Sequence, residues 1–259
     1  MALGAAAGDD GPNQHVYIHE VVDIVGPHRA AYLHHMAANW SPLAQETRKQ
    51  KLFGIWAVLG STSRWPRVVN LWEESDWHGL AASFEAEAVG AGLQDPELER
   101  WWRAASEFRS GGVDRLLEPA PWSPAIDDLC GDGAIGPACV VHDVVTVEPG
   151  SAREHLERVR ADQAGALDPF GWRLIGAFTN GLRDDDECIL LWSVPAWSAW
   201  ADVQAARHTD EGLRSLATSA RPAVVDAERM LLVDGPLSPL RTGRQPTRAD
   251  RTDWTDAPP

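Results

Sequence analysis

The sequence predicts an α+β fold in which two tandem β-α-β-β-α-β repeats pack sheet against sheet inside one chain. The first observation behind this prediction is an internal repeat, because residues 18–22 (IHEVV) recur as residues 141–145 (VHDVV). The second is that residues 71–73 (LWE) are echoed by residues 191–193 (LWS). A unit of about 110 residues has therefore been duplicated and fused, and a chain of 259 residues is long enough for two such units.

The repeats divide the chain into five parts. We expect the first repeat to span residues 15–120 and the second to span residues 139–240, joined by a linker over residues 121–138 that is rich in Pro, Gly and Asp. Residues 1–14 and 241–259 are rich in small and polar residues and carry no hydrophobic period, so we predict that both ends are disordered.

The first repeat begins with a β-rich run that is broken by Gly26-Pro27, and a proline suits the first turn of a helix. The turn-like residues 61–66 separate two further strands, which predicts a hairpin. Asp95-Pro96 is a start signal for the second helix. The elements are expected as strand 17–25, helix 28–38, strands 52–60 and 67–73, a helix from 95, and strand 113–117.

The second repeat reads the same way, with Asn180-Gly181 as a strong turn signal between its two central strands. Its elements are expected as strand 140–147, helix 152–163, strands 173–179 and 188–193, helical structure to 220, and strand 229–233. This order is the ferredoxin-like arrangement, whose sheet has helices on only one face. The second copy is the obvious cover for the bare face of the first.

Composition excludes several classes of function. A formal net charge of −15 leaves no basic face for nucleic acid or for an anionic membrane. No apolar run is long enough for a membrane span, and the first residues lack the layout of a signal peptide, so we expect a cytoplasmic protein. The three cysteines are too few and too scattered for a disulfide framework or a zinc site.

The order of strand, Gly-Pro or Pro-Gly, helix and then a hairpin ending in Val-Asn-Leu-Trp (residues 69–72) resembles the NIPSNAP family of dimeric α/β barrel proteins. The resemblance covers most of both repeats. It implies that two ferredoxin-like sheets enclose a lumen, here within a single chain. It also implies a wider superfamily that includes cofactor-free polyketide cyclases, antibiotic-biosynthesis monooxygenases, haem-dependent enzymes and EthD-like proteins.

The repeated histidine–acid pairs are the first candidate catalytic groups. Side chains alternate along a strand, so His19 and Glu20 face opposite sides of the sheet, as do His142 and Asp143. The more apolar side should pack under the helices, which places both histidines in the lumen, opposite one another. A lumenal histidine can act as a general base near neutral pH. Alternatively, both histidines are structural and were simply copied by the duplication.

The same alternation makes the two acids a puzzle, because a buried carboxylate is costly unless it is paired. Either Glu20 and Asp143 lie in a polar network under the helices, or the assignment of faces is inverted and the acids face the lumen. Both alternatives stay open at the level of the sequence.

A histidine-rich stripe on the first helix, formed by His28, Tyr32 and His35, has no counterpart at Glu154, Arg158 and Asp162 in the second repeat. Two histidines at this spacing can bind a metal, but no further ligand is evident nearby, so we predict no metal site. The stripe marks either a diverged site or a solvated face.

Thirteen tryptophans against two tyrosines suit a roomy apolar pocket, although a packed core would use them too. Asn70 is a polar side chain in an apolar strand, and its counterpart is Leu190. The predicted substrate-binding residues are Trp56, Asn70, Trp72, Phe178, Trp192, Tyr32, His35, Trp40 and Trp65.

These residues together predict an enzyme without a cofactor that does acid/base chemistry on an apolar, aromatic or polyketide-like small molecule. The reaction would be of the cyclase, dehydratase or isomerase type, in secondary metabolism, with His19, Glu20, His142 and Asp143 as catalytic groups. The alternatives are a haem enzyme with one of the histidines as axial ligand, and a non-catalytic binding protein. Further dimerisation into a homodimer is left open. The sequence contains no phosphate-binding loop and no nucleophile elbow.

Overall fold

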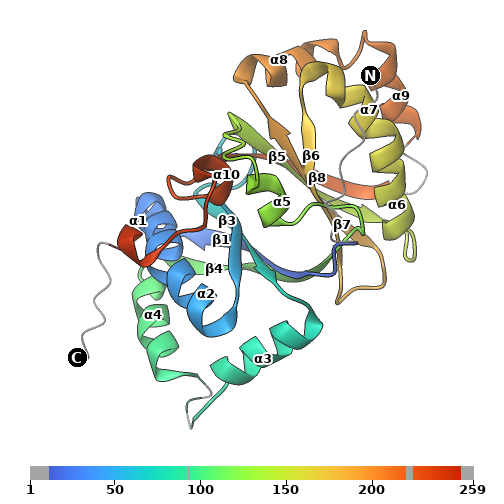
Figure 1. The fold of residues 1–259 in the computed structure, drawn as a ribbon. Helices are drawn as coiled ribbons and strands as arrows, with labels where there is room; N and C mark the ends of the chain where they lie inside the picture. Colours follow the sequence, from blue (N-terminus) through green and yellow to red (C-terminus); the bar gives the residue numbers. More distant parts are fainter. Residues whose placement is uncertain (1–11, 91, 93, 220–223, 252–259) are drawn as a thin grey trace.

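The computed structural model describes residues 12–90, 92, 94–219 and 224–251. Its eight strands form one closed antiparallel barrel in the order β1-β3-β2-β8-β5-β7-β6-β4. Each half of the chain contributes four strands, and its helices cover the outer face of its own strands (Figure 1). The prediction of two repeats that pack into a barrel within one chain is confirmed.

The elements follow the predicted order in both halves. The first half contains β1 (Val16–Ile24), α1 (Arg29–His34), the π-helical η1 (His35–Trp40), α2 (Ser41–Arg48), β2 (Lys51–Val58), β3 (Arg67–Glu74), α3 (Trp77–Glu87), α4 (Pro96–Ser106) and β4 (Arg109–Pro119). The second half contains β5 (Cys139–Val147), α6 (Ala152–Arg158), the π-helical η2 (Val159–Gln163), α7 (Ala164–Leu167), η3 (Asp168–Phe170), β6 (Arg173–Asn180), β7 (Glu187–Val194), α8 (Trp197–Ala206), α9 (Glu211–Ser219) and β8 (Val224–Asp234).

The first helical region is longer than the sequence indicated. It was expected to end at Ala38, but α1, η1 and α2 follow one another without a break to Arg48. Pro42 is the second residue of α2, which follows directly after the π-helical turn η1, and the helix continues through it. The chain leaves the helix at Lys49, whose φ of 61° is left-handed.

The two halves meet along two short seams. Residues 56–58 of β2 pair with residues 232–234 of β8, and residues 117–119 of β4 pair with residues 178–180 of β6. Within each half the strands pair over much longer stretches, such as the eight register pairs that join β1 to β3. Strand pairing alone therefore contributes little to the joint between the halves.

Packed side chains from both halves fill the interior of the barrel. The rings of Tyr17, Phe53 and Phe178 contact one another at centroid distances of 4.8 to 6.3 Å. The remaining buried apolar members of this interior cluster are Val21, Trp56, Val58, Val69, Leu71, Leu117, Ile126, Val140, Ile175, Ile189, Leu191, Met230, Leu232 and Leu240. The predicted lumen is thus occupied by the protein's own side chains.

Two glycines make room for the largest interior rings. A Cβ built on Gly54 would lie 2.1 Å from the indole of Trp56, and one on Gly176 would lie 2.6 Å from the ring of Phe178. The two glycines occupy corresponding positions in β2 and β6 beside the register shifts of those strands. Each aromatic ring therefore packs flat over a position where only glycine fits.

The linker closes one end of the barrel. Its short helix α5 (Ile126–Cys130) places Ile126 in the interior cluster, and the N–H of Ile126 donates to Glu73 Oε2 at 2.9 Å. The same oxygen accepts from the hydroxyl of Tyr17 at 3.1 Å. The linker is thus part of the core and does more than connect the two repeats.

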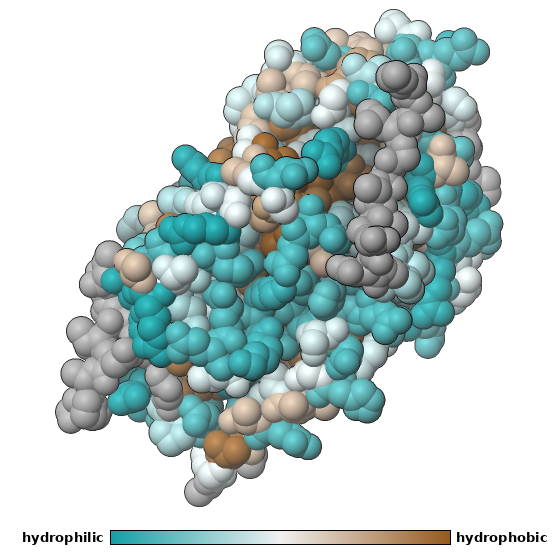
Figure 2. Space-filling model, in the orientation of Figure 1, coloured by the Kyte–Doolittle hydropathy of each residue, from teal (hydrophilic) through white to brown (hydrophobic). Residues whose placement is uncertain are grey.

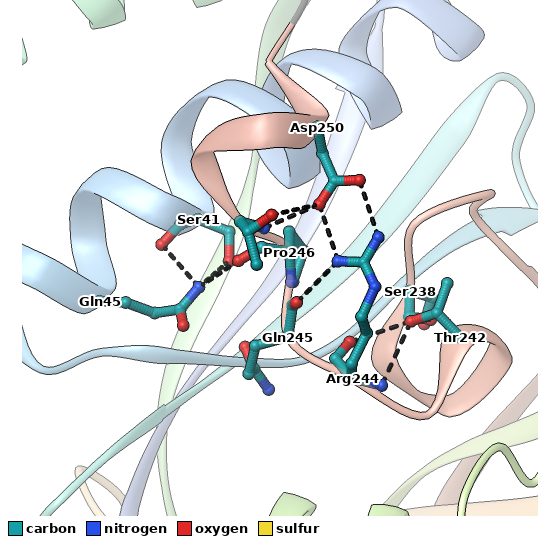
Figure 3. A network of polar contacts seen from close by, with 9 residues as sticks. Ser41, Gln45, Ser238, Thr242, Arg244, Gln245, Pro246 and Asp250 are labelled. Carbon is teal, nitrogen blue, oxygen red and sulfur yellow. Dashed lines mark hydrogen bonds and ion pairs between the residues drawn. The ribbon is translucent and has the colours of Figure 1, made fainter.

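The C-terminal segment is ordered over part of the range that we expected to be disordered. After α10 (Pro239–Thr242), the side chain of Gln245 donates to the carbonyl of Leu52 at 2.8 Å and accepts from its N–H at 2.9 Å. Figure 3 shows how this segment continues beside α2, where Gln45 donates to the carbonyl of Pro246 at 2.9 Å. The segment ends in η4 (Arg248–Asp250).

Ion pairs and hydrogen bonds hold these terminal residues against the rest of the molecule. Arg244 forms an ion pair with Asp250 at 2.8 Å, and Arg248 pairs with Glu46 of α2 (Figure 3 draws the first of these). The second contact joins side chains 202 residues apart in sequence, and a polar composition does not reveal it. Asn13 likewise donates to the hydroxyl of Tyr17, within the range predicted to be disordered. Residues 1–11 and 252–259 lie outside the described residues.

The face of the molecule drawn in Figure 2 is mostly hydrophilic, with hydrophobic side chains gathered in a gap beside α5. A hydrophilic surface agrees with the net charge of −15. Every helix in the described part of the chain is too short or too polar to cross a bilayer.

Replacing Gly54 by alanine should lower the free energy of unfolding by about 1–3 kcal/mol, because the new methyl group overlaps the indole of Trp56. Gly165→Ala in α7 is the matched control, since no atom lies within 4 Å of the added Cβ, and it should be neutral or slightly stabilising. Urea unfolding of both variants measures the difference. Equal effects of the two substitutions would contradict the assigned packing of Trp56.

Candidate functional site

The two repeated histidines face each other inside the barrel, as the alternation along the strands predicts. Both are fully buried, and His19 Nε2 lies 2.8 Å from His142 Nε2, so one ring donates a hydrogen bond to the other. Their rings are nearly parallel, with centroids 5.0 Å apart. Neither Nδ1 atom has a hydrogen-bond partner among the described residues.

The surroundings keep this pair neutral. Burial lowers the pKa of His142 to about 4, with the nearby carboxylate of Asp143 opposing the shift and Arg115 adding to it. Burial, His142 and Arg115 together hold the pKa of His19 well below its usual range. Arg115 itself is bound by Glu187, with Nε donating to Oε1 at 2.8 Å. The Nε2 atom of each neutral ring is engaged in the hydrogen bond to the other ring.

A haem does not fit these residues. The two nitrogens that would ligate iron bind each other, and the fully buried Leu71 and Leu191 stand opposite His19 and His142 in the strand register. No group of three or more His, Cys, Asp and Glu side chains in the described part of the chain is arranged to hold a metal ion.

The two acids lie on the other face of the strands, in the layer between sheet and helices. This decides the puzzle left by the sequence in favour of a polar network under the helices. Glu20 Oε2 accepts from Asn70 Nδ2 at 3.0 Å and from Trp72 Nε1 at 2.8 Å. Asn70 Nδ2 also donates to the hydroxyl of Tyr32 at 2.9 Å. Four residues that the sequence singled out thus meet around one carboxyl group.

The second oxygen of Glu20 is free of such bonds among the described residues. Its nearest cation is Arg109, whose Nη1 lies 4.0 Å from Oε1, and Arg109 stacks over the ring of Trp102 at 4.6 Å. Burial raises the pKa of Glu20, the neighbouring charge of Asp114 raises it further, and Asn70, Trp72 and Arg109 oppose the rise. Asp114 lies directly opposite Glu20 on β4 and is exposed to solvent.

The second half replaces this arrangement with an ion pair. Asp143 accepts from Arg229 Nε at 2.6 Å and from Nη2 at 2.7 Å, so both of its oxygens are engaged. Arg229 of β8 stands where Asp114 stands in β4, opposite the acid in the strand register. The two halves therefore share a framework but differ in charge at the same position.

In the structure, the stripe of His28, Tyr32 and His35 has other counterparts in the second half than the sequence comparison gave. β1 and β5, and the helices that follow them, are offset by 123 residues, which makes His155 the counterpart of Tyr32 and Arg158 the counterpart of His35. His35 stacks on Trp101 at a centroid distance of 5.1 Å, and Trp40 contacts the same ring at 4.6 Å. His35 and Trp40 thus belong to the packing between η1 and α4.

The other predicted pocket residues are not brought to the Glu20 network. Trp56 and Phe178 lie inside the barrel, and Trp192 lies in the helix-facing core of the second half. Trp65 is 60% exposed in the loop between β2 and β3.

Sequence reasoning missed Arg109, Asp114 and Arg229. Arg109 lies outside the predicted last strand of its repeat. Charged residues on an outer strand ordinarily indicate a side exposed to solvent. The only available signal was that the two last strands carry opposite charges at matching positions, Asp114 and Arg229.

No family model matches the sequence, and no curated protein sequence matches it either. Solved structures do resemble the chain. A candidate monooxygenase from Lactobacillus acidophilus NCFM has a TM-score of 0.56 and 10% identity over 91% of this chain and 97% of its own. A candidate monooxygenase from Fusobacterium nucleatum subsp. nucleatum ATCC 25586 has a TM-score of 0.54 and 10% identity over 86% and 93%.

The fold is the dimeric α/β barrel, formed within one chain. Members of the NIPSNAP family, which the sequence resembles, are among its structural neighbours. One of them, from Agrobacterium tumefaciens str. C58, is 20% identical over 40% of this chain and 98% of its own, with a TM-score of 0.35. At these identities the comparisons define the fold only. The chemistry of the site has to be inferred from its own residues.

The buried histidine pair should make stability depend on pH. The folded state keeps His142 neutral down to about pH 4, whereas unfolded histidine takes up a proton near pH 6.5. The unfolded state therefore binds more protons in this window, and stability falls as the pH drops through it. The combined variant His19→Leu, His142→Leu should lose this pH dependence, to which His142 alone contributes on the order of 2 kcal/mol at pH 5.

The measurement is urea unfolding of wild type and double variant at pH 7 and pH 5. The carboxyl groups with raised pKa, including Glu20, are present in both proteins, so their contributions cancel in the comparison. An identical change with pH in the two proteins would contradict the assigned neutrality of the pair.

Proposed function

We propose that the protein is a small-molecule enzyme in which Glu20 acts as a general base beneath the helices of the first half. The observation that carries the proposal is that the two oxygens of this carboxyl group have different surroundings. Asn70 and Trp72 hold Oε2, while no donor of the described residues lies within hydrogen-bond distance of Oε1. A base needs one oxygen fixed for orientation and the other free to accept a proton.

The electrostatics of the site suit such a base. A carboxylate with an ordinary pKa is a weak base, and burial together with Asp114 raises the pKa of Glu20 toward the working range. Arg109 carries a positive charge on the side of the free oxygen, and its Nη1 is buried without a hydrogen-bond partner. It can stabilise an oxyanion that forms when a substrate loses its proton.

The supported reaction is proton transfer on an apolar, planar molecule. Glu20 Oε1 would take a proton from an acidic C–H or O–H bond, and the electron pair of that bond would move to a substrate oxygen facing Arg109. Return of the proton from the Glu20 carboxylic acid to a different atom completes an isomerisation, and loss of a leaving group completes an elimination. Ring closure by the carbanion gives a cyclisation. All three outcomes share the same first step.

Aromatic side chains lie beside Arg109, the cation that faces the free oxygen of Glu20, and beside Phe108, which precedes it in the chain. Trp102 stacks under Arg109, and Phe108 contacts the rings of His28 and His35 at centroid distances of 5.8 Å. Such walls favour a flat apolar ligand. The side chain of Arg109 is 19% exposed and that of Glu20 is 9% exposed, so the site reaches solvent at the β4 side.

Glu20 is preferred over the histidine pair on grounds of geometry. His19 and His142 are fully buried, and each Nε2 is engaged by the other. A substrate could reach either nitrogen only if the packed barrel interior opened. Two structural neighbours that cover most of this chain are candidate monooxygenases, which is compatible with a small organic substrate in this fold.

The base is tested with 5-nitrobenzisoxazole, a flat probe whose C–H proton is removed as its N–O bond breaks to give a coloured phenolate. Wild-type protein should accelerate this ring opening, and Glu20→Gln should lower the rate by at least about 100-fold because the base is lost. The double variant His19→Leu, His142→Leu is the matched control and should retain the rate. Loss of rate in the control with retention in Glu20→Gln would overturn the proposal. Tight probe binding without ring opening by wild-type protein would instead indicate a binding protein.

The pH profile of the same reaction provides an independent test. The carboxylate is the active form, so the rate should rise with pH through a pKa above the ordinary value of glutamate. Asp114→Asn removes a charge that raises the pKa of Glu20, so the rising limb should move to lower pH. A limb that stays in place would show that another group is being titrated.

A further inference from the structure

The second half carries a group of buried donors that the ion pair of Asp143 and Arg229 does not use. Trp192 Nε1, His155 Nδ1, and Nε and Nη2 of Arg158 have no hydrogen-bond partner among the described residues. Trp192 is fully buried and His155 is 2% exposed. Unpaired polar groups at such positions cost free energy unless something binds them.

Internal symmetry places Trp192 and His155 around one point, while Arg158 takes the position of His35. Trp192 and His155 occupy the positions of Trp72 and Tyr32, which converge on Glu20 in the first half. Arg158 follows His155 by three residues on α6, so both project from the same side of the helix. Arg158 and Asp143 lie near enough to His155 for their charges to act on its pKa.

One methylene group accounts for the free indole of Trp192. In the first half the longer side chain of Glu20 reaches Trp72 Nε1 at 2.8 Å. In the second half the acid is Asp143, which is shorter and is bound through both oxygens by Arg229. Leu190 stands in the place of Asn70 and supplies no acceptor.

The balance of charge is opposite in the two halves. Around Glu20 stand two acids and one base, since Asp114 joins Glu20 against Arg109. The second half has two guanidinium groups in this region, Arg229 on β8 and Arg158 on α6, and Arg229 is paired with Asp143. The other, Arg158, has only a contact of 3.5 Å from Nη1 to Glu154, whose side chain is 73% exposed. An anion would complete the second arrangement.

We propose that the layer between α6 and the second sheet binds the carboxylate of a small apolar molecule through Arg158, His155 and Trp192. Two carboxylate oxygens can accept from the guanidinium and indole N–H groups together. Leu156, Val159 and Trp172 belong to the same buried cluster and supply apolar walls for the body of the ligand. The site does not depend on proton transfer at Glu20.

Access comes from the end of α6. The side chain of Arg158 is 33% exposed although its Nε and Nη2 atoms are buried, so it lies at the border of the layer. The π-helical η2 begins directly after it, and π-helical turns often mark functional sites.

The proposal is tested by calorimetric titration of the full chain with benzoate, and with benzyl alcohol as a neutral molecule of similar shape. Benzoate should bind at one site per chain and benzyl alcohol at least tenfold more weakly. Arg158→Gln should weaken benzoate binding at least tenfold, which corresponds to about 1.4 kcal/mol. Arg153→Gln is the matched control, because it removes the same charge from an exposed position of α6.

Trp192→Phe gives a second readout, since it removes the indole N–H while keeping an aromatic ring in the core. It should weaken benzoate more than benzyl alcohol. Absence of benzoate binding, equal effects of Arg158→Gln and Arg153→Gln, or equal affinity for the two probes would each overturn the proposal. Benzoate binding should persist in Glu20→Gln, so failure of the base and failure of this site are distinguishable.

Discussion

Everything in this molecule depends on the need to cover two apolar sheet faces with each other. Each half covers the outer face of its sheet with its own helices and leaves the inner face bare. The seams between the halves are only three residue pairs long at either side, so packing inside the barrel supplies most of the joint. His19 and His142 lie at the centre of that packing, and each finds its hydrogen-bond partner only in the opposite half. Separation of the halves would expose both the apolar faces and two unpaired imidazoles.

A filled interior changes where chemistry can take place. Because Trp56 and Phe178 pack over glycines in the barrel, the space between the sheets is used for stability. The layers between sheets and helices are packed as well, but each of them holds a buried carboxyl group, Glu20 in the first half and Asp143 in the second. The resulting pair of layers has the same backbone and different charges, which is the arrangement that gene fusion permits and a symmetric homodimer does not.

The divergence of the two layers rests on small changes with large electrostatic consequences. Glutamate reaches the indole of Trp72, whereas aspartate at the matching position is too short and turns to an arginine. The exchange of Asp114 for Arg229 in the last strand reverses the charge beside the acid. Buried charges must be paired or neutralised. The first half meets that demand with hydrogen bonds to one oxygen and a raised pKa, and the second meets it with an ion pair.

The sequence by itself determined the duplication, the order of the strands and helices, and that His19 and Glu20 lie on opposite faces of the sheet, although it left open which face lines the barrel. These follow from short-range rules, since side chains alternate along a strand and apolar runs reveal periodicity. It also identified Asn70, Trp72 and Tyr32 as candidates, although not that they meet at Glu20. Only the tertiary structure decided that the histidines bind each other, that the barrel is filled, and that residues 241–251 pack against α2. Those outcomes depend on strand register, side-chain length and contacts between residues more than 100 positions apart, which no local pattern encodes.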